Sequence, residues 1–358
     1  MRRRKRPASK SKSKTKPKTI AASRTPPANV RMREIADRAG VTAMTVSRAL
    51  RTPALVSAET MRRIKSAIEE LGFVPNYAAG SLASRRSRIV VVIVPTLANS
   101  VFADFIEELS ATLNEGGYTA IVGCSNYDHG YQEKLLASFL GWRPAGIILT
   151  GSFHTRRTRE LCEQAGAPII ETWSYTRKPL DTVIGFSNRQ AIYEMTRSMI
   201  AWGHRNIGFG FVESAKNDRT AERRRGWEQA MREAGYDPDP KSCEGGPFSV
   251  SAGAHMVDAI LSRKPETTAI VFGSDTLAIG ALMECRRRGI RVPEDMAISG
   301  FGDVELAAEV VPALTTVRTP RRELGRLCAE VMIKRIEGTY DGPRIIDRGF
   351  EIVRRQSA

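Results

Sequence analysis

The twenty residues from 32 to 51, MREIADRAGVTAMTVSRALR, constrain the fold of this chain more than any other segment. Ala36, Gly40 and Val46 fall at the fifth, ninth and fifteenth positions of this window. A small side chain at Ala36 allows a second helix to approach the first. Gly40 adopts the positive φ of a tight turn at little cost, and Val46 is apolar where the second helix is buried. The window therefore predicts a helix-turn-helix, with an ordinary helical hairpin as the alternative.

The positive charge of the chain is concentrated at its N-terminal end. The net charge is +16; residues 1–88 carry 22 Lys or Arg against five Asp or Glu, and the other residues carry 33 against 34. A basic head joined to an electrically balanced body favours nucleic acid as a partner. Residues 1–29 hold eleven basic and no acidic residues, which predicts a disordered basic tail. This tail either adds affinity for phosphates or is merely solvated, and both alternatives stay open.

Several classes of protein are not expected from this sequence. No apolar region follows the basic run as in a secretory signal, and no apolar run approaches the roughly 18 residues of a membrane span. The five cysteines are scattered and the four histidines lack metal-ligand spacing. We therefore expect reduced thiols in a cytoplasmic protein, with no metal and no cofactor. No phosphate-binding loop or nucleophile elbow is present, so no enzyme activity is expected.

The headpiece, residues 30–75, is expected to contain three short helices. Ser57 can cap the third helix and Gly72 can end it. The helices are predicted over residues 32–39, 43–51 and 58–71. Its core is predicted from apolar positions at helical spacing, namely Ile35, Val46, Leu50, Met61, Ile64, Ile68 and Leu71. The following residues, 76–87, are too few for a stable isolated helix and are expected to form a hinge that orders on its target.

From residue 88 onward, apolar runs alternate with amphipathic segments, which predicts parallel, doubly wound α/β sheets. Strands are predicted over residues 89–94, 118–124, 145–150, 167–172, 206–211, 268–273 and 296–301. Helices are predicted between the first of these strands, over residues 101–115, 130–141 and 156–165. About 270 residues is large for one such sheet, so we expect two lobes with a cleft between them. A ligand would then lie at the carboxyl ends of the strands.

Four segments together resemble the lactose-repressor (LacI/GalR) family of transcription regulators. They are MREIADRAGVTAMTVSRAL, VSAETMRRIKSAIEELGFVPN, RGIRVPEDMAISGF and PALTTVRTP. A fifth segment, residues 146–171, is similar to the gluconate-utilisation repressors within that family. The resemblance implies a periplasmic-binding-protein-like effector and dimerisation domain over residues 88–358. Its N-terminal lobe is expected to span residues 88–187 and 319–343, and its C-terminal lobe residues 188–318 and 344–358.

The resemblance also assigns DNA contacts to the second helix of the headpiece. The positions that read base edges in the family fall on Ala43, Met44 and Arg48. Arg48 has hydrogen-bonding power toward guanine, and its alternative role is a phosphate contact. The residues expected to contact phosphate or cap the helix are Thr42, Thr45 and Ser47.

The hinge of the family inserts into the minor groove of the operator. Its wedging leucine corresponds to Leu82, and Asn76 and Ala79 also match the hinge pattern. Gly80 departs from it, because relatives usually hold Arg there and Gly disfavours helix. The alternative for Leu82 is a plain packing role.

Effector contacts carried over from the resemblance lie in the loops that follow the strands. They are Val101, Phe102, His154, Glu171, Arg219, Arg223, Phe248, Ser274 and Asp303. Ser274 is also expected to cap a helix beginning near Asp275. The family commonly places Asp directly after Gly300-Phe301, but Gly302 stands there in this chain. A missing carboxylate together with Arg219 and Arg223 favours a sugar acid. The alternative for the arginine run is a solvated helix face.

These inferences predict a homodimeric, cytoplasmic repressor that binds a palindromic DNA operator. A gluconate-like sugar acid in the cleft would control operator affinity. The alternatives are a free-standing sugar-binding protein of the periplasmic type, a family member that responds to a neutral sugar or a nucleobase, and an enzyme on a doubly wound sheet. The lack of a signal peptide and the presence of a headpiece argue against the free-standing sugar-binding protein. The absence of GxGxxG after a strand argues against the enzyme.

Overall fold

The computed structural model describes residues 30–51, 55–73, 87–213 and 217–358. They belong to two compact units, residues 1–76 and 77–358. The predicted basic tail lies outside the described residues, as do Asn76, Ala79 and Leu82 of the predicted hinge.

The first unit contains the three predicted helices, α1 (Met32–Ala39), α2 (Ala43–Arg51) and α3 (Ala58–Leu71). Ala36 and Val46 are buried, and Gly40 ends α1 with a φ of 62°. These positions confirm the helix-turn-helix. The core prediction for Leu50 was wrong, because this side chain is 38% exposed and Ala49 is buried instead. Residues three and four positions after Val46 both neighbour it on α2, and in the structure the nearer of the two, Ala49, faces the core.

The ends of α3 and the turn after α1 are fixed by specific contacts. Ser57 Oγ accepts a hydrogen bond from the backbone N–H of Thr60, and Gly72 follows α3 with a φ of 62°, both as predicted. The guanidinium of Arg63 donates to the carbonyl oxygens of Ala39 and Gly40. The φ of Gly40 favours glycine, and a Cβ there would lie 2.6 Å from Arg63 Nη2 and would displace this guanidinium from the two carbonyls.

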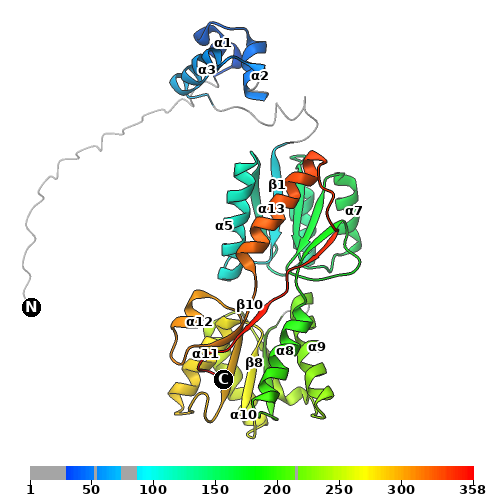
Figure 1. Cartoon of the computed structure of the whole chain (residues 1–358), viewed down its shortest axis with the longest axis vertical. Helices are drawn as coiled ribbons and strands as arrows, with labels where there is room; N and C mark the ends of the chain where they lie inside the picture. The colour runs from blue at the N-terminus through cyan, green and yellow to red at the C-terminus, as the bar shows by residue number, and fades with distance from the viewer. Residues whose placement is uncertain (1–29, 52–54, 74–86, 214–216) are drawn as a thin grey trace, which may run out of the picture. The chain divides into compact units, whose positions relative to one another are not determined.

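The second unit is built from two lobes, each around a six-stranded sheet (Figure 1). The first sheet has the strand order β11-β5-β4-β3-β1-β2 and the second β12-β10-β9-β8-β6-β7. All described pairs are parallel except the antiparallel pair of β10 and β12. Two parallel, doubly wound sheets confirm the predicted fold class.

The first lobe holds ten elements, and α5 and α13 pack side by side on its sheet (Figure 1). They are β1 (Ile89–Val94), α5 (Ser100–Glu115), β2 (Thr119–Cys124), α6 (His129–Leu140), β3 (Gly146–Thr150), α7 (Arg156–Ala165), β4 (Ile169–Thr172), β5 (Thr182–Gly185), α13 (Arg321–Glu337) and β11 (Ile345–Asp347).

The second lobe holds the elements between β5 and α13 and the last strand. They are α8 (Asn188–Ala201), β6 (Ile207–Val212), α9 (Asp218–Glu233), the 3-10 helix η2 (Pro240–Ser242), β7 (Cys243–Gly246), α10 (Val250–Arg263), β8 (Ala269–Phe272), α11 (Asp275–Arg287), β9 (Ala297–Gly302), α12 (Glu305–Glu309), β10 (Thr315–Arg318) and β12 (Glu351–Val353).

The chain passes between the lobes after β5, after β10 and after β11. The last crossing corrects the expected lobe boundary at residue 344. Strand β11 pairs in parallel with β5, with Ile345 opposite Val183, so the chain stays in the first lobe through Asp347. The cause is the bare edge of β5, which this three-residue strand covers.

Apolar packing continues from one lobe into the other. A single buried cluster includes Phe186 of the first lobe and Phe301 of the second, whose ring centroids lie 6.2 Å apart. Each sheet therefore has its own layers, but the lobes meet through aromatic side chains at the carboxyl ends of the strands. None of the described helices is long and apolar enough to cross a membrane.

Candidate functional site

Helix α2 presents the side chains that the sequence assigned to base contacts. Ala43, Met44 and Arg48 are exposed, with Met44 69% exposed. Thr42 Oγ1 accepts a hydrogen bond from the backbone N–H of Thr45, so Thr42 caps α2. Its companions Thr45 and Ser47 are half-buried on the same helix. The geometry leaves the three exposed side chains available to a partner.

A cavity lies between the lobes of the second unit, at the carboxyl ends of the strands. Six of the predicted effector residues line it: Val101, Phe102, Arg219, Arg223, Phe248 and Ser274. Ser274 also caps α11 by accepting a hydrogen bond from the backbone N–H of Thr276. The structure therefore brings together residues that are far apart in the sequence. His154, Glu171 and Asp303 are not among the residues that line this cavity.

Arg223 of α9 is fixed in the cavity wall by three contacts. Its Nε donates to Asn188 Oδ1 at 2.8 Å and its Nη1 donates to the carbonyl of Gly273 at 2.7 Å. Its Cζ lies 3.6 Å from the centroid of the Phe301 ring. Removal from water, followed by repulsion from Arg219, lowers the pKa of Arg223 from its ordinary value. A bound anion would offset both the lost hydration and the repulsion from Arg219, and so would stabilise the charged form of Arg223.

Arg219, one helical turn earlier, is a second cation at the cavity and is 6% exposed. Its Nη1 lies 3.1 Å from Asp218 Oδ1. Its Cζ lies 6.0 Å from the centroid of the Tyr127 ring. Arg219 therefore has one charged neighbour and one aromatic neighbour, and it still lines the cavity.

Two residues missed by the sequence reasoning, Trp173 and Thr319, also line the cavity. Each is 2% exposed, and neither Trp173 Nε1 nor Thr319 Oγ1 has a hydrogen-bond partner among the described residues. A buried polar group without a partner is costly unless a ligand satisfies it. The backbone of Trp173 has a φ of 63°, which is rare for a bulky side chain and occurs mostly at functional sites. The sequence signal that could have identified Trp173 as a site residue was its position directly after a predicted strand.

Gly302, at the position where the resemblance implies Asp, forms part of the cavity. Its φ is 135°, and a Cβ there would lie 3.2 Å from Val101 Cγ1 and 3.3 Å from Asp275 Oδ2. The backbone thus disfavours any side chain at this position. The carboxylate of the next residue, Asp303, lies 2.6 Å from Arg318 Nε and 2.7 Å from Arg355 Nη2. These two guanidinium groups balance its negative charge.

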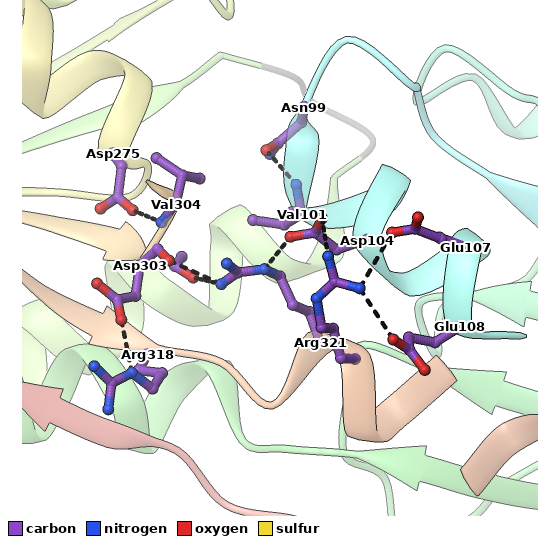
Figure 2. A network of polar contacts seen from close by, with 12 residues as sticks. Asn99, Val101, Asp104, Glu107, Glu108, Asp275, Asp303, Val304, Arg318 and Arg321 are labelled. Atoms are coloured by element: carbon purple, nitrogen blue, oxygen red, sulfur yellow. Dashed lines mark hydrogen bonds and ion pairs between the residues drawn. The ribbon is translucent and has the colours of Figure 1, made fainter. Parts of the chain in front are cut away.

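A polar network joins α5, which carries Val101 and Phe102, to the end of β9 (Figure 2). Figure 2 shows Arg321 between Asp104 of α5 and the segment that contains Asp303. Arg321 Nη1 donates to the carbonyl oxygens of Gly302 and Asp303 at 3.0 and 2.8 Å. The network therefore fixes the distance between two walls of the cavity that belong to different lobes.

His154 and Glu171 form a buried pair elsewhere in the first lobe. His154 Nε2 lies 3.1 Å from Glu171 Oε1, and His154 Nδ1 lies 3.3 Å from Gln132 Nε2. The second carboxylate oxygen of Glu171 accepts a hydrogen bond from the backbone N–H of Leu180 at 2.6 Å. These contacts tie α6, the β3–α7 loop and β4 together. Among the described residues, no group of His, Cys, Asp or Glu could hold a metal ion.

Comparison with known proteins identifies the family. Residues 31–76 match the family described as bacterial regulatory proteins, lacI family, and residues 196–358 match the periplasmic binding protein-like domain. The chain is 36% identical over 321 residues to the HTH-type transcriptional regulator GntR of Escherichia coli K12, covering 90% of this chain and 96% of that protein. The chain belongs to the lacI family. This lacI-family protein is a DNA-binding transcription regulator with an effector-binding domain, and not an enzyme.

Two further relatives agree with this assignment. The HTH-type transcriptional regulator IdnR of Escherichia coli K12 is 31% identical over 326 residues, covering 90% of this regulator and 97% of IdnR. A crystal structure of a lacI-family transcriptional regulator from Silicibacter pomeroyi superposes with a TM-score of 0.84 at 32% identity. It covers 92% of this regulator and 99% of that chain. The matches therefore extend through the headpiece and both lobes.

Proposed function

We propose that this lacI-family regulator is a cytoplasmic homodimer that represses transcription from a palindromic operator, and that a sugar acid such as gluconate controls its operator affinity. The observation that carries the proposal is the charge of the cavity. Among the described residues that line it, Arg219 and Arg223 are the charged ones, and both are positive. Such a cavity favours an anion over a neutral ligand.

The surroundings of the two arginines support an anionic ligand further. Asp303 is paired with Arg318 and Arg355, and Gly302 supplies no side chain. A carboxylate without such cationic partners, at either place, would repel an anion. The relatives GntR and IdnR, together with the resemblance of residues 146–171, make gluconate the first sugar acid to test.

Other groups in the cavity suit the polyhydroxyl part of a sugar acid. Trp173 Nε1 and Thr319 Oγ1 are buried and have no hydrogen-bond partner in the described part of the chain, so a ligand hydroxyl would satisfy each of them. Phe248 and Phe102 add apolar surface for the C–H groups of the ligand. Specificity by a few polar groups on an apolar wall is usual for small-molecule sites.

The headpiece would supply operator recognition. Arg48 would donate two hydrogen bonds to one guanine, while Ala43 and Met44 would offer apolar contact to thymine methyl groups. Thr45 and Ser47 would contact phosphates. In the hinge we propose that Leu82 wedges into the minor groove, with Asn76 and Ala79 beside it.

The effector proposal is tested by calorimetric titration and thermal unfolding of the full chain with gluconate, related sugar acids and glucose. Gluconate should bind and raise the unfolding temperature, and glucose should not. Arg219→Ala should abolish the shift. Arg225→Ala is the matched control, because Arg225 lies on the same helix with a 61% exposed side chain paired to Glu222. A response to glucose but to no sugar acid would overturn the proposal.

The operator proposal is tested by a gel shift with the regulator's own upstream DNA, with and without gluconate. The regulator should retard this DNA in preference to random fragments, and gluconate should change its affinity. Sedimentation of the protein alone should give twice the monomer mass. A monomer, or equal retardation of all fragments, would contradict the proposal.

A further inference from the structure

The loop that follows β3 in the first lobe contacts the beginning of α9 in the second. The backbone N–H groups of Ser152 and Phe153 donate to Asp218 Oδ2 at 2.9 and 3.2 Å. Asp218 is the first residue of α9. Its carboxylate is therefore a bridge between the lobes that uses two hydrogen bonds assisted by charge.

Gly151 makes room for this bridge. Its φ is 95°, and a Cβ built on it would lie 2.7 Å from Arg219 Nη1 and 3.1 Å from Asp218 Oδ2. Any other residue would push the Asp218–Arg219 pair away from the loop. The backbone conformation thus favours glycine, and a Cβ could be accommodated only by moving the ends of these two side chains.

The loop is held from behind by the buried pair already described. His154, the residue after Phe153, lies against Glu171 and Gln132, and its side chain is fully buried. The amide groups that donate to Asp218 therefore directly precede a residue, His154, whose side chain is held in place in the first lobe. This gives the His154–Glu171 pair a role away from the ligand.

The same carboxylate also fixes a cation of the cavity. Asp218 Oδ1 accepts hydrogen bonds from the backbone N–H of Arg219 at 2.9 Å and from its Nη1 at 3.1 Å. We infer that Asp218 is a positioning residue. It clasps the two lobes in the arrangement that the structure has, termed here the closed form, and it holds Arg219 toward the effector. The part of this inference that concerns the effector rests on the proposed function, whereas the clasp between the lobes does not.

The ionisation of Asp218 is consistent with this role. Burial alone would raise its pKa, but the charge of Arg219 and the amide groups of Ser152, Phe153 and Arg219 outweigh burial, so its pKa lies below the ordinary value. The carboxylate is therefore ionised at neutral pH and keeps its full strength as an acceptor.

Hydrogen exchange of the full chain without ligand tests the clasp directly. In Asp218→Ala the amides of Ser152 and Phe153 lose their acceptor, and we expect their exchange to accelerate about tenfold. Asp258→Ala is the control, since Asp258 pairs with Arg288 on the exposed surface of the same lobe. Unchanged exchange at Ser152 and Phe153 would overturn the inference.

A second variant reaches the clasp from the opposite lobe. Gly151→Ala should accelerate the same amides, while Gly166→Ala should not, because Gly166 also has a positive φ of 56° but an added Cβ there meets nothing within 4 Å. A urea midpoint measured for each variant separates opening of the clasp from loss of the fold. Equal exchange in both glycine variants would contradict the steric argument.

Gluconate affinity tests the positioning of Arg219. Asp218→Ala should weaken binding about tenfold, since Arg219 is no longer oriented and the closed form is less populated. Tighter binding would show that Asp218 competes with the ligand for Arg219, and would overturn the inference. If the unmodified regulator binds no sugar acid, the proposed function fails, and the exchange experiment still decides the clasp.

Discussion

The guanidinium carbon of Arg223 lies 3.6 Å from the centroid of the Phe301 ring. Arg223 belongs to α9 and Phe301 to β9, and both line the cavity. The ring face offers the cation partial compensation for the water it has lost. Phe301 in turn packs toward Phe186 of the first lobe, so the position of the cation is coupled to the contact between the lobes.

Arg223→Lys should weaken gluconate binding by about 2 kcal/mol, measured by calorimetry. Lysine keeps the positive charge, but a single ammonium nitrogen replaces the separate Nε and Nη1 donors to Asn188 and Gly273, and it has no planar group to stack on Phe301. Arg224→Lys is the matched control, because Arg224 pairs with Glu228 and its side chain is 40% exposed. Equal affinity in both variants would show that charge alone matters at position 223.

Gly302→Asp should destabilise the second unit by about 1–3 kcal/mol, because an L side chain is strained at a φ of 135°. It should also abolish gluconate binding, since the new carboxylate would stand in the cavity wall. Gly302→Ala separates the two effects: it should share the loss of stability in urea unfolding and retain most of the affinity. If Gly302→Ala binds as poorly as Gly302→Asp, repulsion is not the cause.

Strands that consist of a long apolar run could be predicted from the sequence, whereas the short strands at the edges of the sheets could not. The run at 89–94 predicted β1 to the residue, because a strand buried on both faces must be apolar throughout. In contrast, β7 consists of Cys243–Gly246 with the sequence CEGG and depends on its neighbour β6 rather than on its own composition. Whether these residues form a strand is decided by their pairing with β6 in the folded protein, and the local sequence does not indicate that pairing.

The candidate site shows the same division. The resemblance predicted that Val101 and Phe102 lie at the effector site, and their place after the first strand of a parallel sheet agrees with the cavity that they line. The sequence places Glu171 near the end of a strand but does not say which face of the sheet it occupies. Side-chain alternation puts Glu171 on the same face as Ile169, and Ile169 packs in a different hydrophobic cluster from Ile170. Trp173 would follow the same alternation, but its positive φ turns it into the cluster that faces the other lobe. No sequence rule predicts that reversal.

His154→Ala should lower the free energy of unfolding by about 3–5 kcal/mol, because it leaves Glu171 buried without its partner. Urea unfolding measures this loss, and gluconate affinity of the folded fraction should change far less. His204→Ala is the control, with an expected loss within about 1 kcal/mol, since the hydrogen bond between His204 Nδ1 and Thr268 Oγ1 lies near the surface. A small loss in His154→Ala combined with lost gluconate binding would instead support direct contact with the effector.

Arg48→Ala should weaken operator binding by about 1–3 kcal/mol and relax discrimination at one base pair. The measurement is a gel shift against operators substituted at each position. Arg62→Ala provides a comparison on α3, where Arg62 is exposed and any loss should be uniform across sequences. Uniform weakening in Arg48→Ala as well would show that Arg48 contacts the phosphate backbone only.

Asp275 should give the stability of the second unit a distinctive pH dependence. Burial raises its pKa to about 6, against the lowering effect of hydrogen bonds from Thr316 and the backbone N–H of Val304. The folded form therefore holds a proton that the unfolded chain releases near pH 4, so this contribution is present at low pH and is lost as the pH rises toward 7. The free energy of unfolding relative to Asp275→Asn, which does not titrate, should fall by about 2 kcal/mol between pH 4.5 and 7. Thr316→Val removes a donor that lowers the pKa and should move this fall to higher pH, whereas parallel curves for the unmodified protein and Asp275→Asn would contradict the assignment.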